Sequence, residues 1–192
     1  MDSLRNRLIL LIAISLVVSG CASGPAISVN QDPDADFTAY QTYRYASDLG
    51  TDRGGYSTLI TRYFKDAIDR EMQNRGYLLE ESEADLLVNF NARVEDRTDV
   101  VSRPTPSYGY YGYRYGLYGA WPMYDNEVTT VHYQVGTANV DIVDVGSNQL
   151  IWEGVAVGRL GSRIEEDPAG AIGDTIAEIF TRYPVPAPEA GE

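Results

Sequence analysis

Two stretches of the chain carry apolar residues at the three-and-four spacing of an amphipathic helix. The first runs from Leu59 to Met72, with Ser57 placed to cap its start and Gly76 placed for a left-handed cap at its end. Its apolar stripe is Leu59, Ile60, Tyr63, Phe64, Ala67, Ile68 and Met72, and its polar side is Arg62, Asp66, Asp69 and Arg70. The pattern predicts a helix with one buried face.

The second helical pattern starts at Asp167-Pro168, a capping residue followed by proline at the first helical position. We expect this helix to stop before Pro184. Its apolar positions are Ile172, Ile176, Ile179 and Phe180. The last predicted element of the domain is therefore a second helix with one buried face.

Elsewhere apolar and polar residues alternate with the period of two that is typical of a half-buried strand. Strands are predicted at residues 37–45, 77–79, 85–94, 127–135, 137–145 and 150–157. The clearest is 85–94, in which every second residue is apolar from Leu86 to Val94. Gly146-Ser147-Asn148 joins the last two strands as a hairpin turn, because Gly and Asn tolerate positive φ.

The order of these elements indicates the fold class. Strand, helix, several strands and a final helix predict an α+β domain, a two-layer sandwich with an antiparallel sheet and two helices packed on one face. We expect a single domain at residues 37–184. Residues 21–36 are small and polar and are predicted to be a tether, and the proline-rich residues 185–192 are predicted to be a disordered tail.

The N-terminal residues 1–20 have the pattern of a secretory signal peptide. Arg5 and Arg7 precede an apolar run that is too short to span a bilayer. The run ends in Val18-Ser19-Gly20-Cys21, which resembles the lipobox of bacterial lipoproteins. The resemblance implies cleavage before Cys21 and acylation of that residue, including palmitate, so that the mature chain is held in the lipid bilayer. The alternative is a free thiol that happens to follow an ordinary signal.

The localisation follows from the same residues by resemblance. Ala22 and Ser23 replace the aspartate that favours inner-membrane retention in enterobacterial lipoproteins. We therefore expect an outer-membrane lipoprotein in the bacterial cell envelope, facing the periplasm.

Charge and composition narrow the possible partners. The chain has 15 basic and 28 acidic residues and a net charge of −13, with Lys65 as its single lysine. Nucleic acids and anionic lipids bind clustered Lys and Arg, so neither is an expected partner. Cys21 is the one cysteine, which excludes an intramolecular disulfide and a zinc-thiolate site. The sequence predicts no cofactor.

Several short motifs, in this order, carry a resemblance to a known family. They are Phe37-x-x-Tyr40-x-x-Tyr43, Arg75-Gly76-Tyr77, Ala84-Asp85-Leu86-Leu87-Val88, Gly136-Thr137 through residues 140–144 to Leu150-Ile151-Trp152-Glu153-Gly154, and finally Ile179-Phe180 with Tyr183-Pro184. With the lipobox, this order resembles the bacterial lipoproteins called domain of unknown function 4136. The resemblance covers about residues 37–184. It implies a fold and a location, but no reaction and no catalytic residues.

Residues 104–126 form the most distinctive internal segment. Seven tyrosines alternate with glycines and are accompanied by a tryptophan: Tyr108, Tyr110, Tyr111, Tyr113, Tyr115, Tyr118, Tyr124 and Trp121. So much glycine predicts a loop. One interpretation is a flexible insertion with no specific role. A second is a recognition surface whose aromatic rings bind envelope glycan or an envelope protein. A third is self-association.

Catalysis has little support in the sequence. The single histidine, His132, lies in a predicted strand, and no nucleophile motif accompanies it. Asp141 and Asp144 with Trp152 nearby are typical of a glycosidase, but three residues apart on a strand they point to opposite faces. The acidic run Asp32, Asp34, Asp36 does not match a calcium loop, since Phe37 and Tyr43 stand where Gly and Glu are required.

The sequence thus favours a non-catalytic envelope lipoprotein that binds or scaffolds other envelope components. The alternative is an envelope hydrolase that cleaves cell-wall glycan through Asp141 or Asp144. In the non-catalytic interpretation, Trp152 is a packing residue, and the two aspartates form hydrogen bonds in the hairpin or in a buried turn.

Overall fold

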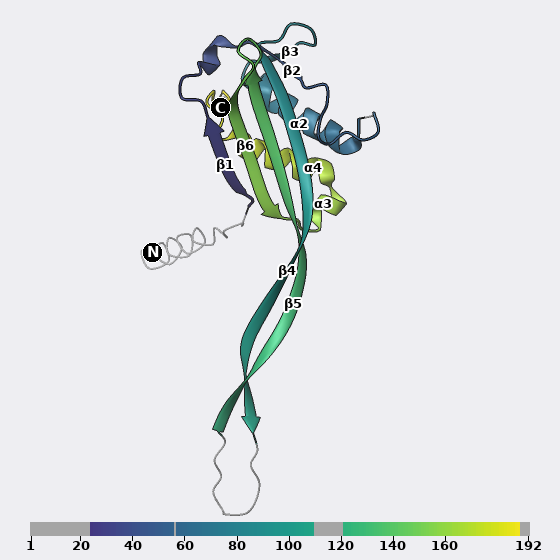
Figure 1. Cartoon of the computed structure of the whole chain (residues 1–192), viewed down its shortest axis with the longest axis vertical. Helices are drawn as coiled ribbons and strands as arrows, with labels where there is room; N and C mark the ends of the chain where they lie inside the picture. Colours follow the sequence, from purple (N-terminus) through teal and green to yellow (C-terminus); the bar gives the residue numbers. More distant parts are fainter. Residues whose placement is uncertain (1–23, 56, 110–120, 189–192) are drawn as a thin grey trace, which may run out of the picture.

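The computed structural model describes residues 24–55, 57–109 and 121–188. In this part of the chain one six-stranded sheet has the order β1-β6-β5-β4-β2-β3 (Figure 1). The strands are β1 (Ala26–Gln31), β2 (Thr42–Tyr45), β3 (Leu78–Leu79), β4 (Leu86–Gly109), β5 (Trp121–Asp144) and β6 (Gln149–Arg159). The helices are α2 (Leu59–Asn74), α3 (Arg163–Glu166) and α4 (Pro168–Phe180), with a 3-10 turn η1 at Phe37–Ala39. The fold is α+β, as predicted.

The sheet is mixed, so the prediction of a wholly antiparallel sheet was wrong. β2 runs parallel to both of its neighbours, β3 and β4, while the remaining pairs are antiparallel. Parallel neighbours need a crossover connection, and α2 supplies it between β2 and β3. The short β2 is fixed by Asp85, whose Oδ2 accepts the backbone N–H groups of Gln41 at 2.8 Å and Thr42 at 2.9 Å.

The expected tether contains a strand of the sheet. Residues 26–31 form β1, which pairs antiparallel with β6 from Ala26 opposite Val157 to Gln31 opposite Trp152. The alternation of Ile27 and Val29 with polar residues gives this strand a half-buried face. Only residues 22–25 remain as a linker between Cys21, which lies outside the described residues, and the sheet.

Both predicted helices are present. α2 starts at Leu59, as the pattern predicted, but the prediction of Ser57 as its cap was wrong, because the Thr58 hydroxyl accepts the N–H of Thr61 at 3.1 Å. Gly76 has φ of +90°, as its predicted capping position requires. α4 starts at Pro168 with Asp167 as its cap, and Asp167 Oδ1 accepts the N–H of Gly170 at 2.9 Å.

The core lies between the helices and one face of the sheet. Leu86, Val88 and Phe90 of β4 are fully buried, and the ring of Phe90 stacks on Phe64 of α2 at 5.1 Å between centroids. Trp152 of β6, fully buried, packs against Phe180 of α4. Figure 1 shows α2 and α4 behind the sheet.

Glycine is required at position 154 because α4 lies so close to β6 there. A Cβ on Gly154 would collide with Ile179 and with the ring of Trp152. This explains the Trp152-Glu153-Gly154 motif as a packing motif.

Arg75 connects α2 to the end of the chain. Its Nη2 donates to the carbonyl of Phe180 at 2.8 Å, its Nε donates to the carbonyl of Val185 at 2.9 Å, and its Nη1 forms an ion pair with Glu71 at 2.7 Å. Val185, which was predicted to belong to the disordered tail, packs against the core.

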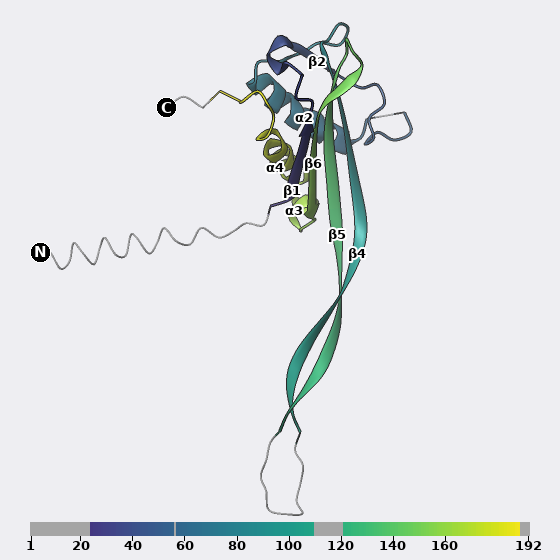
Figure 2. The ribbon, with the colours of Figure 1, turned by 60° about the vertical axis from the view of Figure 1, so that its left-hand side comes forward.

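β4 and β5 are far longer than predicted. They stay paired from Leu86 opposite Asp144 to Gly109 opposite Trp121, so residues 104–109 and 121–126 are strand and not loop. Figure 1 and Figure 2 show the two strands leaving the body of the molecule as a twisted ribbon. In residues 24–55, 57–109 and 121–188, no helix has the length and apolar character needed to cross a membrane.

Candidate functional site

The ribbon formed by residues 96–109 and 121–134, which we call the arm, has no other strand beside it in the described structure. β2 ends at Tyr45, opposite Val88 of β4, and β6 ends at Arg159, opposite Val135 of β5. Beyond these points β4 and β5 pair with each other alone (Figure 2). The arm projects from the same end of the sheet at which β1 begins, because Ala26, Val157, Thr137 and Arg93 lie side by side on four neighbouring strands.

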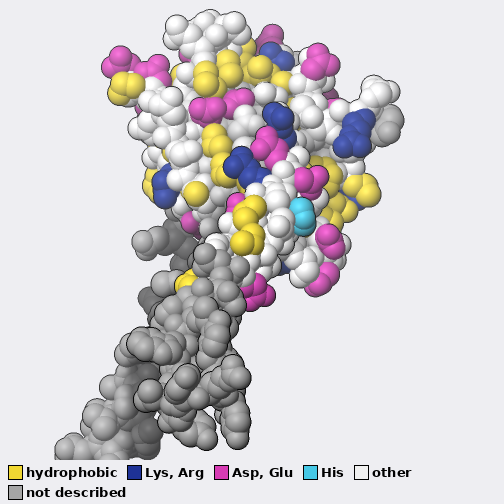
Figure 3. All heavy atoms as spheres, turned by 60° about the horizontal axis from the view of Figure 1, so that its bottom comes forward, with side chains coloured by type: hydrophobic (Ala, Val, Ile, Leu, Met, Phe, Trp, Pro, Cys, Tyr) yellow, Lys and Arg dark blue, Asp and Glu magenta, His cyan; other side chains and the backbone are white. Residues whose placement is uncertain are grey.

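One face of the arm and its base is charged. The odd-numbered residues Arg93, Glu95, Arg97 and Asp99 follow one another along β4 with alternating sign. Glu95 forms ion pairs with Arg93 at 3.2 Å and with Arg97 at 3.3 Å. Figure 3, which views this end of the molecule, shows basic and acidic side chains intermingled. All of these pairs are exposed, so each contributes little to stability.

The other face of the arm carries few charges. It has Val94, Val100 and Val128, which are 57%, 68% and 62% exposed. Its polar groups pair across the two strands: Thr98 Oγ1 lies 3.0 Å from His132 Nδ1, and Gln134 Nε2 donates to Asp96 Oδ1 at 2.9 Å. None of the helices in the described residues covers this face, although it continues the face that α2 and α4 cover in the body.

The described part of the predicted tyrosine site lies at the far end of the arm. Tyr108 is in β4, and Trp121 and Tyr124 are in β5, where the backbone pairing places Tyr108 opposite Pro122. Tyr110, Tyr111, Tyr113, Tyr115 and Tyr118 lie outside the described residues, as does Cys21. The aromatic segment therefore follows a long projecting support.

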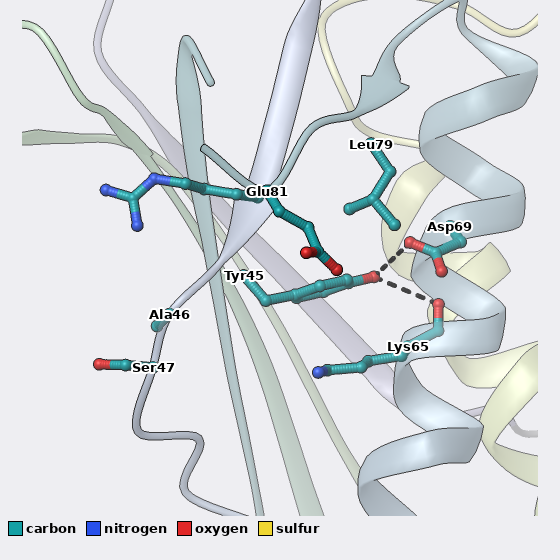
Figure 4. Close-up of a pocket in the computed structure, with 8 residues that line it drawn as sticks. Tyr45, Ala46, Ser47, Lys65, Asp69, Leu79 and Glu81 are labelled. Atoms are coloured by element: carbon teal, nitrogen blue, oxygen red, sulfur yellow. Dashed lines mark hydrogen bonds between the residues drawn. The ribbon is translucent and has the colours of Figure 1, made fainter. Parts of the chain in front are cut away.

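A hollow of about 380 Å³ lies on the body between β2, α2 and the segment after β3 (Figure 4). Tyr45, Lys65 and Asp69 line it, with Leu79 and Glu81 on the far side. The Tyr45 hydroxyl donates to Asp69 Oδ1 at 2.6 Å and the Lys65 ammonium lies 4.9 Å from the Tyr45 ring centre. The hollow is open to solvent and was not predicted from the sequence.

Asp69 was predicted on the solvent-facing polar side of its helix. That prediction was wrong, because the Asp69 side chain faces β2 and connects α2 to it through hydrogen bonds. Its Oδ1 accepts two hydroxyls, from Tyr43 and Tyr45, each at 2.6 Å. Burial raises the pKa of both tyrosines, and the neighbouring Asp69 carboxylate raises each further. The spacing of Tyr43 and Tyr45 on one face of a strand was the signal for this cluster. With two donors on one oxygen, Asp69 is a structural acceptor.

Asp141 and Asp144 do not form a shared site. Asp141 accepts amide groups of Asn89 at 3.3 Å and Asn139 at 3.2 Å. Asp144 accepts the Ser147 hydroxyl at 2.9 Å and the N–H of Gly146 at 2.8 Å, and the Ser147 bond holds the pKa of Asp144 below its usual range. Asp144 thus stabilises the β5–β6 hairpin, as the sequence indicated.

Nothing around the remaining catalytic candidates supports a reaction. His132 is exposed on the arm, and Trp152 is buried in the core, where no sugar ring reaches it. Within the described ranges no three His, Cys, Asp or Glu side chains come together as metal ligands.

The comparisons with known proteins show the fold. A family model described as "Domain of unknown function (DUF4136)" matches residues 27–185. No curated protein matches the chain. A PDZ domain protein from Parabacteroides distasonis is similar in structure with a TM-score of 0.50 and 14% identity, over 84% of this chain.

That similarity concerns 36% of the Parabacteroides distasonis chain, so this protein spans about a third of its length. The PelC dodecamer from Paraburkholderia phytofirmans gives a TM-score of 0.45 at 9% identity, over 81% of this chain and 94% of that one. At 14% identity the similarity to the Parabacteroides distasonis protein shows a shared fold alone, and no argument about this chain rests on the PelC structure.

Proposed function

Because the chain belongs to the DUF4136 family, whose description assigns no reaction, we propose that it is a non-catalytic binding or scaffolding module, held at the outer membrane of a bacterial envelope by acylated Cys21. The observation that carries this proposal is the arm. It carries the backbone of Tyr108 and Trp121 at its end, far from the body (Figure 1).

The aromatic composition of the segment at the end of the arm suits binding. Tyrosine offers a large contact area and has only two side-chain torsions to immobilise, so each ring costs little conformational entropy on binding. Aromatic faces also stack on the apolar faces of sugar rings. We propose envelope glycan as the ligand, with an envelope protein as the other kind of partner.

The signal pattern at residues 1–20 supports the anchor. Two or three acyl chains hold a protein at a bilayer essentially permanently, whereas one chain is marginal. Since only residues 22–25 separate Cys21 from β1, the body is held close to the membrane surface.

A replacement of residues 110–120 by Gly and Ser at equal length tests the binding role. The variant keeps the reach of the arm and removes five tyrosines. We expect its thermal unfolding to match the parent, because the body supplies the core, and we expect co-sedimentation with purified peptidoglycan sacculi to be lost. Crosslinking to envelope proteins is measured in parallel. Unchanged binding in both assays would contradict the proposal for this segment.

The anchor has a separate test. Cys21→Ser prevents acylation, so the variant should move to the soluble fraction and incorporate no labelled palmitate. Retention of Cys21→Ser in the membrane fraction would show that the lipobox assignment is wrong, whatever the arm binds.

A further inference from the structure

The outer edge of β4 is an unpaired sheet edge at the base of the arm. The carbonyl of Val88 accepts the N–H of Ala46 at 2.9 Å, so even-numbered residues of β4 direct their backbone groups outward, away from β5. After Val88 no strand of the described structure receives these groups. An exposed edge of this kind is a template for pairing with another strand.

The free edge has two defined ends. β2 occupies it up to Val88, and Pro104 and Pro106 interrupt it from the other side, because proline has no N–H to donate. Phe90 is fully buried, so the residues that remain free to pair in a ladder with outward N–H and C=O groups are the even positions from Ala92 to Ser102. Asp96 lies within one residue of the midpoint of this run.

The charges along this edge are arranged symmetrically about Asp96. Arg93 and Asp99 stand three residues on either side of Asp96, and Glu95 and Arg97 stand one residue on either side. The sequence of charges is therefore self-complementary when a second β4 runs antiparallel to the first about Asp96. Opposite charges on facing residues stabilise a pair of strands, and like charges destabilise it.

We propose that two copies of this chain pair through β4, antiparallel and two-fold symmetric about Asp96. Arg93 of each copy then faces Asp99 of the other, and Glu95 faces Arg97, which gives four opposite-charge contacts. Five pairs of outward residues from 92 to 100 face one another, for about ten backbone hydrogen bonds.

Other registers are less favourable. A shift of the centre to residue 95 or 97 places Arg93 opposite Arg97, or Glu95 opposite Asp99. A shift to residue 98 places Arg93 opposite Arg103. A parallel pairing in equal register puts every charge opposite itself. The free edge of β5 offers no such match, since its charged residues near the arm end, Asp125 and Glu127, are both acidic.

One contact in the proposed pair is unfavourable. Asp96 lies on the two-fold axis and faces its own copy, with Gln134 as its hydrogen-bond donor within the chain. This gives the proposal a signature that a general electrostatic attraction lacks: removal of the Asp96 charge should tighten the pair.

The test uses the full chain in detergent, with molar mass measured by light scattering and composition by native mass spectrometry. We expect a dimer for the parent. Glu95→Arg places arginine opposite arginine and Arg97→Glu places glutamate opposite glutamate, so each variant alone should have a dissociation constant at least about tenfold higher.

An equimolar mixture of the two variants restores complementarity, because the arginines of one face the glutamates of the other. We expect heterodimers with an affinity close to that of the parent. A loss of ion pairs within one chain would not be rescued by mixing, which separates the proposal from a structural role of these residues.

Two further variants fix the register. Arg103→Glu is the matched control, because residue 103 faces Asn89 and the dimer should be unchanged. Asp96→Asn should tighten the dimer severalfold. A monomeric parent, an open-ended polymer, a mixture without heterodimers, or an Asp96→Asn variant that binds more weakly would each overturn the proposal. Circular dichroism confirms that each exposed substitution leaves the fold intact.

Discussion

The body and the arm are built from the same two strands but by different physical means. Within the body, β5 has β4 and β6 on its two sides, β4 also has β2 beside it at residues 86–88, and the two strands bury Phe90, Val140 and Ile142. Beyond Glu95 the same strands pair only with each other, and Val100 and Val128 are exposed. An isolated two-stranded ribbon is marginally stable in water. The body therefore accounts for the stability of the fold, and the arm is the region that contact with another molecule would stabilise most.

The largest expected effect in the body comes from Arg75. Arg75→Ala leaves the Glu71 carboxylate and two carbonyls near the C-terminal end of α4 without their partner. We expect the free energy of unfolding to fall by about 3–5 kcal/mol, as for other broken buried ion pairs.

Chemical denaturation of Arg75→Ala measures this loss. Arg97→Ala is the matched control from the arm, where an exposed pair contributes about 0–1 kcal/mol. Equal effects of the two substitutions would contradict the division between body and arm.

A smaller effect is expected at Asp69, within the body but outside its apolar core. Asp69→Ala removes the acceptor of the Tyr43 and Tyr45 hydroxyls and should destabilise the fold by about 2–3 kcal/mol. Asp66→Ala on the exposed side of the same helix should change stability by less than about 0.5 kcal/mol. Thermal unfolding of the two variants checks the difference, and similar melting temperatures would show that Asp69 does not hold β2 to α2.

Acid should weaken the body through Asp85. Backbone N–H groups of Gln41 and Thr42 hold the pKa of Asp85 below its usual range. A lowered pKa in the folded state means that the contribution is present at neutral pH and is lost as pH falls below about 4. In Asp85→Asn we expect a shallower loss of stability with acid, measured by denaturation at a series of pH values. A parallel curve for parent and variant would refute this role.

The smallest expected effect belongs to the arm. Deletion of residues 96–134, with Glu95 and Val135 joined by an Asn-Gly turn, removes no buried side chain among the described residues. The free energy of unfolding per chain should change by less than about 0.5 kcal/mol at concentrations at which the chain is monomeric. Calorimetry on the deletion variant measures this, and a large drop in melting temperature would mean that the arm supports the body.

The same division explains what the sequence could predict. α2 and α4 follow from local signals, the apolar stripes and the cap at Asp167, and both are where the pattern places them to within two residues. Gly76 and the β5–β6 hairpin are equally local. These elements lie in the body, where burial of one face requires apolar residues at a regular spacing along the sequence.

The missed features depend on distant partners. β1 has only six residues with a half-buried face, a signal too weak to separate from a tether. The parallel pairing of β2 depends on Asp85 from another part of the chain. The extension of β4 and β5 follows from pairing without burial, so no apolar alternation marks it. Likewise, the role of Asp69 depends on two tyrosines at least 24 residues away in sequence.

The shared end of β1 and the arm has a mechanical consequence. Were Cys21 acylated as we propose, the body would be attached close to the start of β1, and the arm would act as a lever about 46 Å long at roughly 3.3 Å per residue. A rocking of the body by about 10° would carry the end of the arm through about 8 Å. Small reorientations of the body would then become large displacements of Tyr108 and Trp121, and a partner bound there would have a corresponding mechanical advantage over the orientation of the body.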